Sequence, residues 1–461
     1  MPRVLSTSLP AYVGTTVTAA GWVHRRRQLK SVTFLILRDA AGLAQVVVTD
    51  ADLRARLAEL PEESVLEVTG RVVGNPAAPA GAELVDPTVR PLGDPAVPPP
   101  FDVYRPELTA SLPTQLDNAA VALRHPSRSA ALRVSAALVA GFRATLDRLG
   151  FVEVHTPKIV SAATESGANV FALDYFGRPG YLAQSPQFYK QMLVGVLERV
   201  YEVGPVFRAE PHDTTRHLAQ YTSLDVEFGF VTDHRDVMRL LREVLAGMLG
   251  RLAEHPAPEP PPGASTTRIP AVPVEIPSVP VVPSAIRAAP VEIPVVPAEI
   301  PAVHFVEALA IAGAPPDEPD LAPAHERALG EWARTEHGSD FLFVTGYPLA
   351  KRPFYTHPAT GDGPSGGSLR AYSNGFDLLF RGVELVTGGQ RLHRYADYLA
   401  ALAQRGEPVE PYAGYLDAFR HGMPPHGGFA IGLERMVARL LGVANVREVT
   451  AFPRDLHRLT P

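Results

Sequence analysis

Residues 207–230, FRAEPHDTTRHLAQYTSLDVEFGF, restrict the fold of this chain more than any other stretch. Apolar and polar residues alternate on both sides of a polar loop that contains Arg216 and His217. Such alternation predicts an antiparallel hairpin with one face packed against the core. The other face would carry four charged residues: Arg208, Glu210, Asp225 and Glu227. On spacing alone these residues fit a surface ion pair better than a site for a ligand with a phosphate and a donor-bearing ring.

The length of 461 residues allows two or three domains with sizeable cores. Cysteine is absent, which excludes disulfides, zinc–thiolate sites and a cysteine nucleophile, and which fits a reducing cytoplasm. No apolar run approaches the ~20 residues of a membrane span, and the N-terminal stretch lacks the apolar core of a signal peptide. We therefore expect a cytoplasmic protein that has no membrane partner.

The first hundred residues predict a small β-barrel. Short alternating runs separated by turn residues occupy residues 16–23, 33–39, 44–50, 64–73 and 81–92. This pattern is typical of an OB-fold, which binds single-stranded nucleic acid on its surface. Phe34 could stack a base and Gln45 could read its edge, although Phe34 fits a core position equally well. The net charge of −6 gives no global sign of such a partner, and the basic run 24–30 is also typical of a solvated face.

A second stretch, GGFAIGLER at 427–435, changes the interpretation of the 207–230 segment. Together the two stretches resemble motifs 2 and 3 of class II aminoacyl-tRNA synthetases. Residues 132–149, a predicted helix, and the following GFVEVHTPKI resemble motif 1. The resemblance extends over residues 21–461 and is closest to the aspartyl branch in its archaeal-type form, which the ending FPRD…RLTP also resembles.

The resemblance implies an α+β protein with an OB-fold barrel and a class II catalytic domain, an antiparallel sheet flanked by helices. We expect the anticodon-binding barrel at residues 1–100, a proline-stiffened hinge at 101–127 and the catalytic domain at 128–461. Residues 256–301 contain 14 prolines in 46 positions and interrupt the catalytic domain. Their composition fits a tolerated surface insertion better than a docking segment.

By resemblance, the expected reaction uses ATP and Mg²⁺ to activate L-aspartate as aspartyl-adenylate and then transfers the aspartyl group to tRNA. The residues that match ATP-binding positions are Arg208, Glu210, Arg216, His217, Tyr221, Glu384, Gly432 and Arg435, of which Arg208, Glu210 and Arg435 match catalytic positions. Glu384 and Asp377 match the magnesium ligands. Their separation of seven residues would place them on opposite faces of an uninterrupted strand, so spacing alone does not predict a metal pair.

The positions that match the aspartate-binding residues of the family are Glu165, Gln187, Lys190, Asp225 and Arg391. Lys190 and Arg391 would offer two cations to the side-chain carboxylate, whereas Glu165 and Asp225 suit the ammonium group. A neutral asparagine would leave the two buried cations undercompensated, which predicts strong rejection.

Phe34 and Gln45 match the anticodon-binding residues of the family, and His24 and Pro79 match the relaxed enzymes that charge both tRNA(Asp) and tRNA(Asn). The relaxed form implies an amidotransferase that converts Asp-tRNA(Asn), and motif 1 implies a homodimer. Four alternatives stay open. They are an enzyme restricted to tRNA(Asp), an asparaginyl-tRNA synthetase, an amide ligase that makes free asparagine, and a non-catalytic RNA-binding paralogue.

Overall fold

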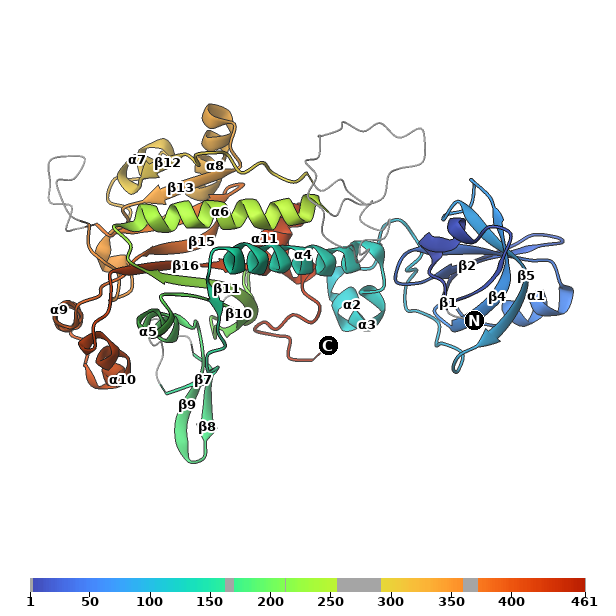
Figure 1. Cartoon of the computed structure of the whole chain (residues 1–461), viewed down its shortest axis with the longest axis horizontal. Coiled ribbons are helices and arrows are strands. Elements are labelled where there is room, and N and C mark those ends of the chain that lie inside the picture. Colours follow the sequence, from blue (N-terminus) through green and yellow to red (C-terminus); the bar gives the residue numbers. More distant parts are fainter. Residues whose placement is uncertain (1–2, 162–169, 212, 255–291, 360–371, 461) are drawn as a thin grey trace. The chain divides into compact units, whose positions relative to one another are not determined.

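The computed structural model describes residues 3–161, 170–211, 213–254, 292–359 and 372–460. The chain forms two compact units (Figure 1). The first comprises the described residues up to Arg133 together with Glu254, and the second comprises Val134–Ala253 and Glu292–Thr460. The division falls inside helix α4 (Pro126–Arg148).

The first unit contains the barrel, whose strands are β1 (Thr16–Gln28), β2 (Thr33–Arg38), β3 (Leu43–Val48), β4 (Val65–Gly74) and β5 (Ala82–Pro91). They close in the order β1-β2-β3-β5-β4, and helix α1 (Ala51–Ala58) follows β3. Alternate residues such as Leu35 and Val46 are fully buried because successive side chains of a strand point to opposite faces. The predicted OB-fold is therefore confirmed.

The second unit is built on an eight-stranded sheet in the order β12-β13-β14-β15-β16-β11-β10-β6. The strands are β6 (Val152–Glu153), β10 (Arg199–Phe207), β11 (Gln220–Gly229), β12 (Ala302–His304), β13 (Phe341–Thr345), β14 (Gly375–Phe380), β15 (Val383–Gln390) and β16 (His426–Gly432). The six central strands are antiparallel, as predicted, whereas the edge pairs β12–β13 and β10–β6 are parallel.

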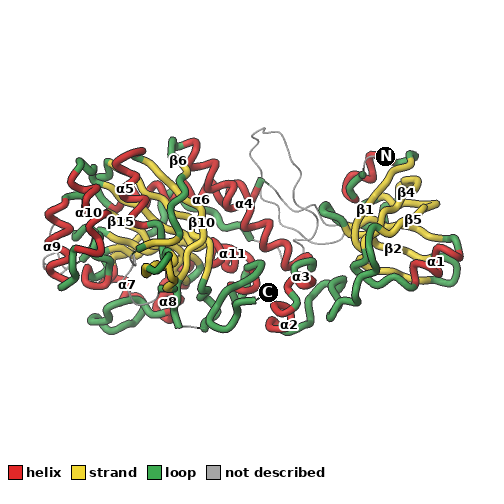
Figure 2. The backbone as a smooth tube through the Cα atoms, turned by 90° about the horizontal axis from the view of Figure 1, so that it is seen from below, coloured by secondary structure: helices red, strands yellow, loops and turns green. Residues whose placement is uncertain are grey.

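Helices cover this sheet, and Figure 2 shows them around the strands. Helix α6 (His234–Ala253) packs against β15 and β16, and α5 (Gln187–Leu197) packs against β10 and β11. The second unit also contains α7 (Phe305–Ile311), α8 (Pro323–His337), α9 (Tyr395–Arg405), α10 (Ala413–Asp417) and α11 (Leu433–Leu441). Helices α2 (Leu112–Asp117) and α3 (Ala119–Ala122) belong to the first unit.

Helix α4 lies beside α6, and the two backbones meet at Gly141, where an added Cβ would lie 2.8 Å from the carbonyl oxygen of Gly247 (Figures 1 and 2). By length and composition alone, α4 is long and apolar enough to cross a membrane, although the sequence analysis expected no such run. Its Leu138, Phe142 and Leu146 are fully buried inside the protein, as in the core helix of a folded domain.

An antiparallel hairpin is confirmed, because β10 and β11 pair from Phe207–Gln220 to Arg199–Phe228. Two details of the expectation are wrong. Strand β10 ends at Phe207, so Arg208 and Glu210 lie in the loop and not on a strand face, and Asp225 and Glu227 are buried, with exposures of 1% and 0%. Strand β16 pairs with the other edge of β11, and α5 packs over it, so this face of the hairpin is covered.

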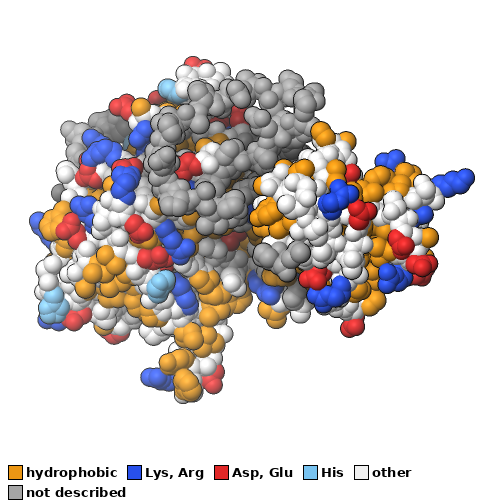
Figure 3. Space-filling model, turned by 45° about the vertical axis from the view of Figure 1, so that its right-hand side comes forward, with side chains coloured by type: hydrophobic (Ala, Val, Ile, Leu, Met, Phe, Trp, Pro, Cys, Tyr) orange, Lys and Arg blue, Asp and Glu red, His pale blue; other side chains and the backbone are white. Residues whose placement is uncertain are grey.

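On the face that Figure 3 shows, basic and acidic side chains are interspersed among the described residues. A small sheet of β7 (Ile159–Val160), β9 (Arg178–Leu182) and β8 (Ala172–Tyr175) projects below the main sheet in Figure 1. Phe176 at its turn is 89% exposed.

Candidate active site

A cavity of about 410 Å³ opens in the second unit. It brings together residues that the sequence places far apart: Gln187, Arg208, Glu210, Arg216, His217, Tyr221, Glu384, Arg391, Gly432 and Arg435. Sheet topology explains this convergence, because β15, β16, β11 and β10 are neighbours although they come from distant parts of the chain. In the register, Ser223 of β11 faces Gly432 of β16.

The loop between β10 and β11 forms one wall of the cavity, and the C-terminal segment anchors it. Arg447 donates to Asp213 at 2.7 Å and to the carbonyl oxygen of Thr214 at 3.0 Å, and it also pairs with Asp455. The backbone amide of Ala219 donates to a carbonyl oxygen of this segment at 2.7 Å. A polar loop is thus held in a defined position.

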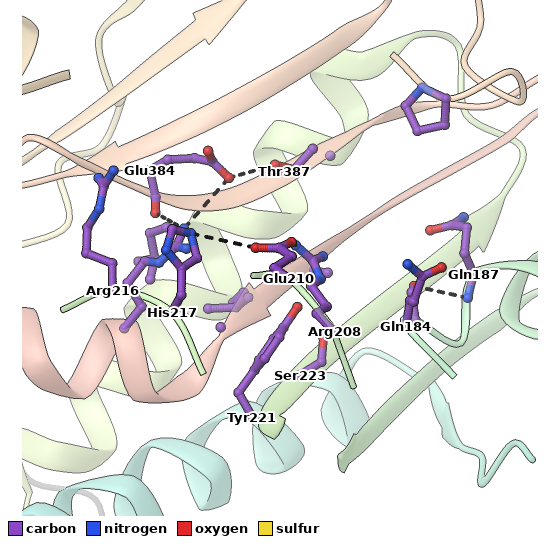
Figure 4. Close-up of a pocket in the computed structure, with 18 of the residues that line it drawn as sticks. Gln184, Gln187, Arg208, Glu210, Arg216, His217, Tyr221, Ser223, Glu384 and Thr387 are labelled. Carbon is purple, nitrogen blue, oxygen red and sulfur yellow. Dashed lines mark hydrogen bonds and ion pairs between the residues drawn. The ribbon is translucent and has the colours of Figure 1, made fainter. Parts of the chain in front are cut away.

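This loop and the start of β11 carry the group that matches the ATP-binding positions. The Arg208 guanidinium lies 5.5 Å from the centroid of the Tyr221 ring, which suits a cation–π contact. Glu210 lies 3.9 Å from Arg208 and 4.0 Å from His217, so these contacts are electrostatic and too long for hydrogen bonds. His217 is oriented by the Thr214 hydroxyl at 2.6 Å. In Figure 4, Arg208 lies between His217 on one side and the glutamines of the other end of the cavity on the other.

Glu384 extends from β15 into the same end of the cavity (Figure 4). The Thr387 hydroxyl donates to its carboxylate at 3.2 Å, and Arg435 lies 3.8 Å away. Burial alone would raise the pKa of Glu384, but Arg435 and Arg352 outweigh it and hold the pKa below its usual value. An ionised carboxylate is therefore available at neutral pH, as a magnesium ligand requires.

Asp377 lies beneath the cavity surface and does not line it. Arg352 donates to both of its oxygens, at 3.1 and 2.8 Å. Its pKa is raised, mainly by burial, with the charge of Glu384 acting in the same direction and Arg352 opposing it. The uninterrupted strand assumed from the spacing does not exist, because a turn separates β14 from β15 and the two carboxylates lie on paired strands.

Glu384 and Asp377 could hold magnesium only together with ligands that the protein does not supply. Among the described residues, no cluster of three or more acidic or histidine side chains could hold a metal by itself. Magnesium usually keeps several waters and takes one or two carboxylates together with substrate phosphates, so Glu384 in an open cavity is sufficient. Asp377 is engaged by Arg352 and would have to share its oxygens.

The residues that match the aspartate-binding positions form a buried charge cluster at the other end. The ammonium of Lys190, 1% exposed, lies 3.0 Å from Asp225 and 3.3 Å from Glu227. Arg391 donates to Glu227 at 2.9 Å. The expectation of undercompensated cations is therefore corrected, since two carboxylates already balance the two cations. Burial acts to raise the pKa of Glu227, but Arg391 and Lys190 dominate and lower it.

Only part of this cluster reaches the cavity. Arg391 and Gln187 line it, whereas Lys190 and Asp225 lie behind them. Asp225 is also bonded by the Ser223 hydroxyl at 2.5 Å. Glu165 lies outside the described residues.

Other polar residues line the cavity without having been assigned a role from the sequence, among them Gln184, Ser185, Ser223, Lys351, Arg352, Thr387 and Glu434. The run QSPQFYKQ did carry a signal for the first two, because it resembles the family over all eight positions. Glu434 accepts from the backbone amide of Thr222 at 3.0 and 3.1 Å, a contact that only the folded sheet creates.

In the first unit, the structure places Phe34 and Gln45 on one face of the barrel. They belong to the neighbouring strands β2 and β3, and they alternate with fully buried residues such as Leu35 and Val46. Phe34 is thus not a core residue. The amide of Gln45 donates to Glu83 at 2.7 Å.

His24 and Pro79 have different environments. Pro79 is exposed in the turn between β4 and β5. His24 occupies a β-bulge of β1 and is only 8% exposed, 3.5 Å from Arg38. Burial, assisted by Arg38, lowers the pKa of His24 to about 4, so it is neutral.

Comparison with known proteins agrees with this geometry. Residues 111–456 match the family "tRNA synthetases class II (D, K and N)", and residues 17–92 match the "OB-fold nucleic acid binding domain". The aspartate–tRNA(Asp/Asn) ligase of Thermus thermophilus is 45% identical, with all of both chains covered. That of Deinococcus radiodurans is 44% identical, covering 100% of this chain and 99% of the relative.

Among solved structures, asparaginyl-tRNA synthetase from Pyrococcus horikoshii complexed with asparaginyl-adenylate is similar with a TM-score of 0.84, 29% identity and full coverage of both chains. The chain therefore belongs to the class II tRNA synthetases of the aspartate, lysine and asparagine group and, within that group, to the aspartate–tRNA ligases.

Proposed function

We propose that this protein attaches L-aspartate to tRNA(Asp) and tRNA(Asn) in two steps at the expense of ATP. The observation that carries the proposal is a single cavity with two chemically different ends. Arg208, Glu210, His217 and Glu384 form one end, and Arg391, backed by Lys190, forms the other. Arg208 lies between the ends, where two substrates would react.

In the first step, the α-carboxylate of aspartate attacks the α-phosphorus of ATP and pyrophosphate leaves. Arg208 would hold the α-phosphate and the attacking carboxylate together. Its positive charge would offset the repulsion between these two anionic groups and keep them in position for the attack. Tyr221 would stack against the adenine ring, and Glu210 would accept from its amino group. No covalent intermediate with the enzyme is needed.

The phosphate tail would meet three cationic or polar side chains of the same end, Arg216, His217 and Arg435. Glu384 is the residue best placed to hold Mg²⁺, with Asp377 as a second carboxylate behind it. When bound, the metal would neutralise charge on the phosphate oxygens. In the second step, the activated aspartyl group passes to the terminal ribose of tRNA.

Preference for aspartate rests on Arg391. Its Nε and Nη2 atoms donate to Glu227 and to the carbonyl oxygen of Gly428, and Arg391 also lines the cavity. A substrate carboxylate beside this guanidinium would gain a charge-assisted bond that a neutral amide cannot match. The fold alone does not separate the aspartyl from the asparaginyl enzymes, which share this architecture; the aspartate–tRNA ligase relatives make that distinction.

The proposal extends to tRNA(Asn) because His24 and Pro79 match the relaxed type and because the two most similar relatives described above carry the name aspartate–tRNA(Asp/Asn) ligase. A downstream amidotransferase, a homodimer through the motif 1 region and a cytoplasmic location belong to the same proposal.

The deciding experiment is aspartylation of purified tRNA(Asp) and tRNA(Asn) transcripts side by side. Comparable charging of both is the expected result. Charging of tRNA(Asp) alone would refute the relaxed assignment. A lack of aspartate-dependent ATP–pyrophosphate exchange would refute the enzymatic proposal and favour a non-catalytic RNA-binding role.

A further inference from the structure

A buried carboxylate outside the cavity connects two of its walls. Glu326 lies in the first turn of α8, is 6% exposed and does not line the cavity. One oxygen of its carboxylate, Oε2, accepts from Nη1 of Arg216 at 3.2 Å and from the backbone amide of Glu384 at 3.0 Å. The first contact reaches the loop between β10 and β11, and the second reaches strand β15.

The position of this carboxylate is fixed by close packing of α8 on the turn between β14 and β15. Gly382 in that turn has φ +71°, and a Cβ there would lie 3.0 Å from the Cα of Arg327. A Cβ on Gly330 of α8 would lie 2.4 Å from the Cα of Gly382. Both positions therefore favour glycine, and the helix and the turn pack backbone against backbone.

The peptide of Glu384 is held from both sides. Its amide donates to Glu326, and its carbonyl oxygen accepts from Nη1 of Arg435 at 2.6 Å. Two contacts thus hold the backbone of Glu384, and the Thr387 hydroxyl holds its carboxylate. The same Glu326 oxygen links the backbone of Glu384 to the Arg216 guanidinium.

We propose that Glu326 is a positioning residue for ATP, which holds Arg216 and Glu384 at the separation that the phosphate tail and its magnesium ion require. The inference rests on the proposed function, because it assigns these two residues to the nucleotide end of the cavity. Glu326 itself touches neither substrate. It acts by holding Arg216 and Glu384 in place before ATP binds, so that the nucleotide end of the cavity is already arranged for the phosphate tail.

The structure gives this role a specific signature. Loss of Glu326 alters the nucleotide end and leaves the charge cluster of Lys190, Arg391 and Glu227 intact, since that cluster shares no contact with it. KM for ATP and the magnesium concentration that gives half-maximal exchange should therefore rise together, with KM for aspartate unchanged. A merely structural role would lower the unfolding temperature and change both KM values alike.

The test uses the full-length protein with Glu326→Gln, which keeps the shape and an acceptor oxygen but loses the charge, and Glu326→Ala, which loses both contacts. The matched control is Glu331→Gln on the same helix, whose partner Arg334 and own side chain are 65% and 64% exposed. Each variant is assayed by aspartate-dependent ATP–pyrophosphate exchange. Direct titration with ATP in the absence of aspartate and thermal unfolding supply readouts that do not depend on turnover.

We expect ATP affinity to fall about tenfold in E326Q and more in E326A, the effect of losing hydrogen bonds to charged groups. The control should stay within about twofold of the parent. The effects of E326A and Arg216→Ala should add to less than their sum in the double variant, because each single change already removes the contact between Glu326 and Arg216.

An E326Q protein with parental ATP affinity and magnesium requirement would overturn the proposal. Equal increases in both KM values together with a lower unfolding temperature would also overturn it, in favour of a structural role. Failure of the proposed function is a separate result, since the parent protein would then show no exchange with aspartate at all.

Discussion

The buried charge cluster behind the cavity makes a quantitative prediction for Lys190→Met. Methionine has nearly the same length as lysine but no charge, so the substitution leaves Asp225 and Glu227 facing Arg391 alone. Both carboxylates are buried, at 1% and 0% exposure, so water cannot replace the ion pairs that they lose with Lys190. Removal of one partner from a buried ion pair costs about 3–5 kcal/mol of unfolding free energy, and we expect this range here.

The assay is urea unfolding followed by tryptophan fluorescence. The chain has two tryptophans, and Trp332 of α8 lies in the second unit, whereas Trp22 lies in the barrel. In a Trp22→Phe background the signal reports the second unit alone. Arg334→Met is the control, because its exposed pair with Glu331 should contribute about 0–1 kcal/mol.

Restored charge balance should restore stability. In the double variant Lys190→Met with Asp225→Asn, one cation and one carboxylate remain, and more than half of the lost free energy should return. A loss below about 1 kcal/mol in Lys190→Met would refute the view that Lys190 compensates these carboxylates. A double variant that is less stable than the single one would refute the charge argument even if the single loss is large.

Three further predictions concern pH, the loop and the barrel. The pKa values of His24 and His426 are both lowered to about 4, mainly by burial, so the unfolded chain binds the proton first and each unit should lose about 3 kcal/mol as pH falls from 6.5 to 4. Urea midpoints that do not change with pH would contradict this assignment. A His426→Gln variant whose midpoint depends on pH as strongly as that of the parent would contradict it as well. Arg447→Gln frees the loop between β10 and β11 and should weaken ATP binding about tenfold in a direct titration while KM for aspartate stays constant; equal ATP affinity would show that the anchor is dispensable. Phe34→Ala should weaken tRNA binding by about 1–3 kcal/mol in a filter-binding assay without changing ATP–pyrophosphate exchange. Unchanged tRNA binding would show that Phe34 does not stack a base.

The parts of the molecule that follow from local pattern were predictable from the sequence. The barrel strands and the β10–β11 hairpin have strict alternation, which depends only on strand geometry. The bulge that buries His24 breaks the alternation without any glycine or proline to signal it.

Other features depend on contacts between distant segments. Asp225 and Glu227 are polar and fall on the face predicted to be open, but pairing of β16 and packing of α5 cover them. Glu326 occupies an ordinary helical position, and only the fold brings its carboxylate to Arg216 and Glu384. Resemblance to a family identified ten of the residues that line the cavity, yet it could not show that Lys190 and Arg391 are already neutralised.

The position of β12 at the edge of the large sheet has a consequence for how the chain can vary in length. This strand follows the proline-rich segment and, among the strands that the structure describes, pairs only with β13. None of those strands takes its register from the outer side of β12, so residues gained or lost between α6 and β12 leave their order in the sheet intact. Each doubling of such a connection costs only about 0.6 kcal/mol in closure entropy. This junction is therefore a permissive site, where natural variants could lengthen and where an engineered tag or domain could be inserted far along the chain from the catalytic residues.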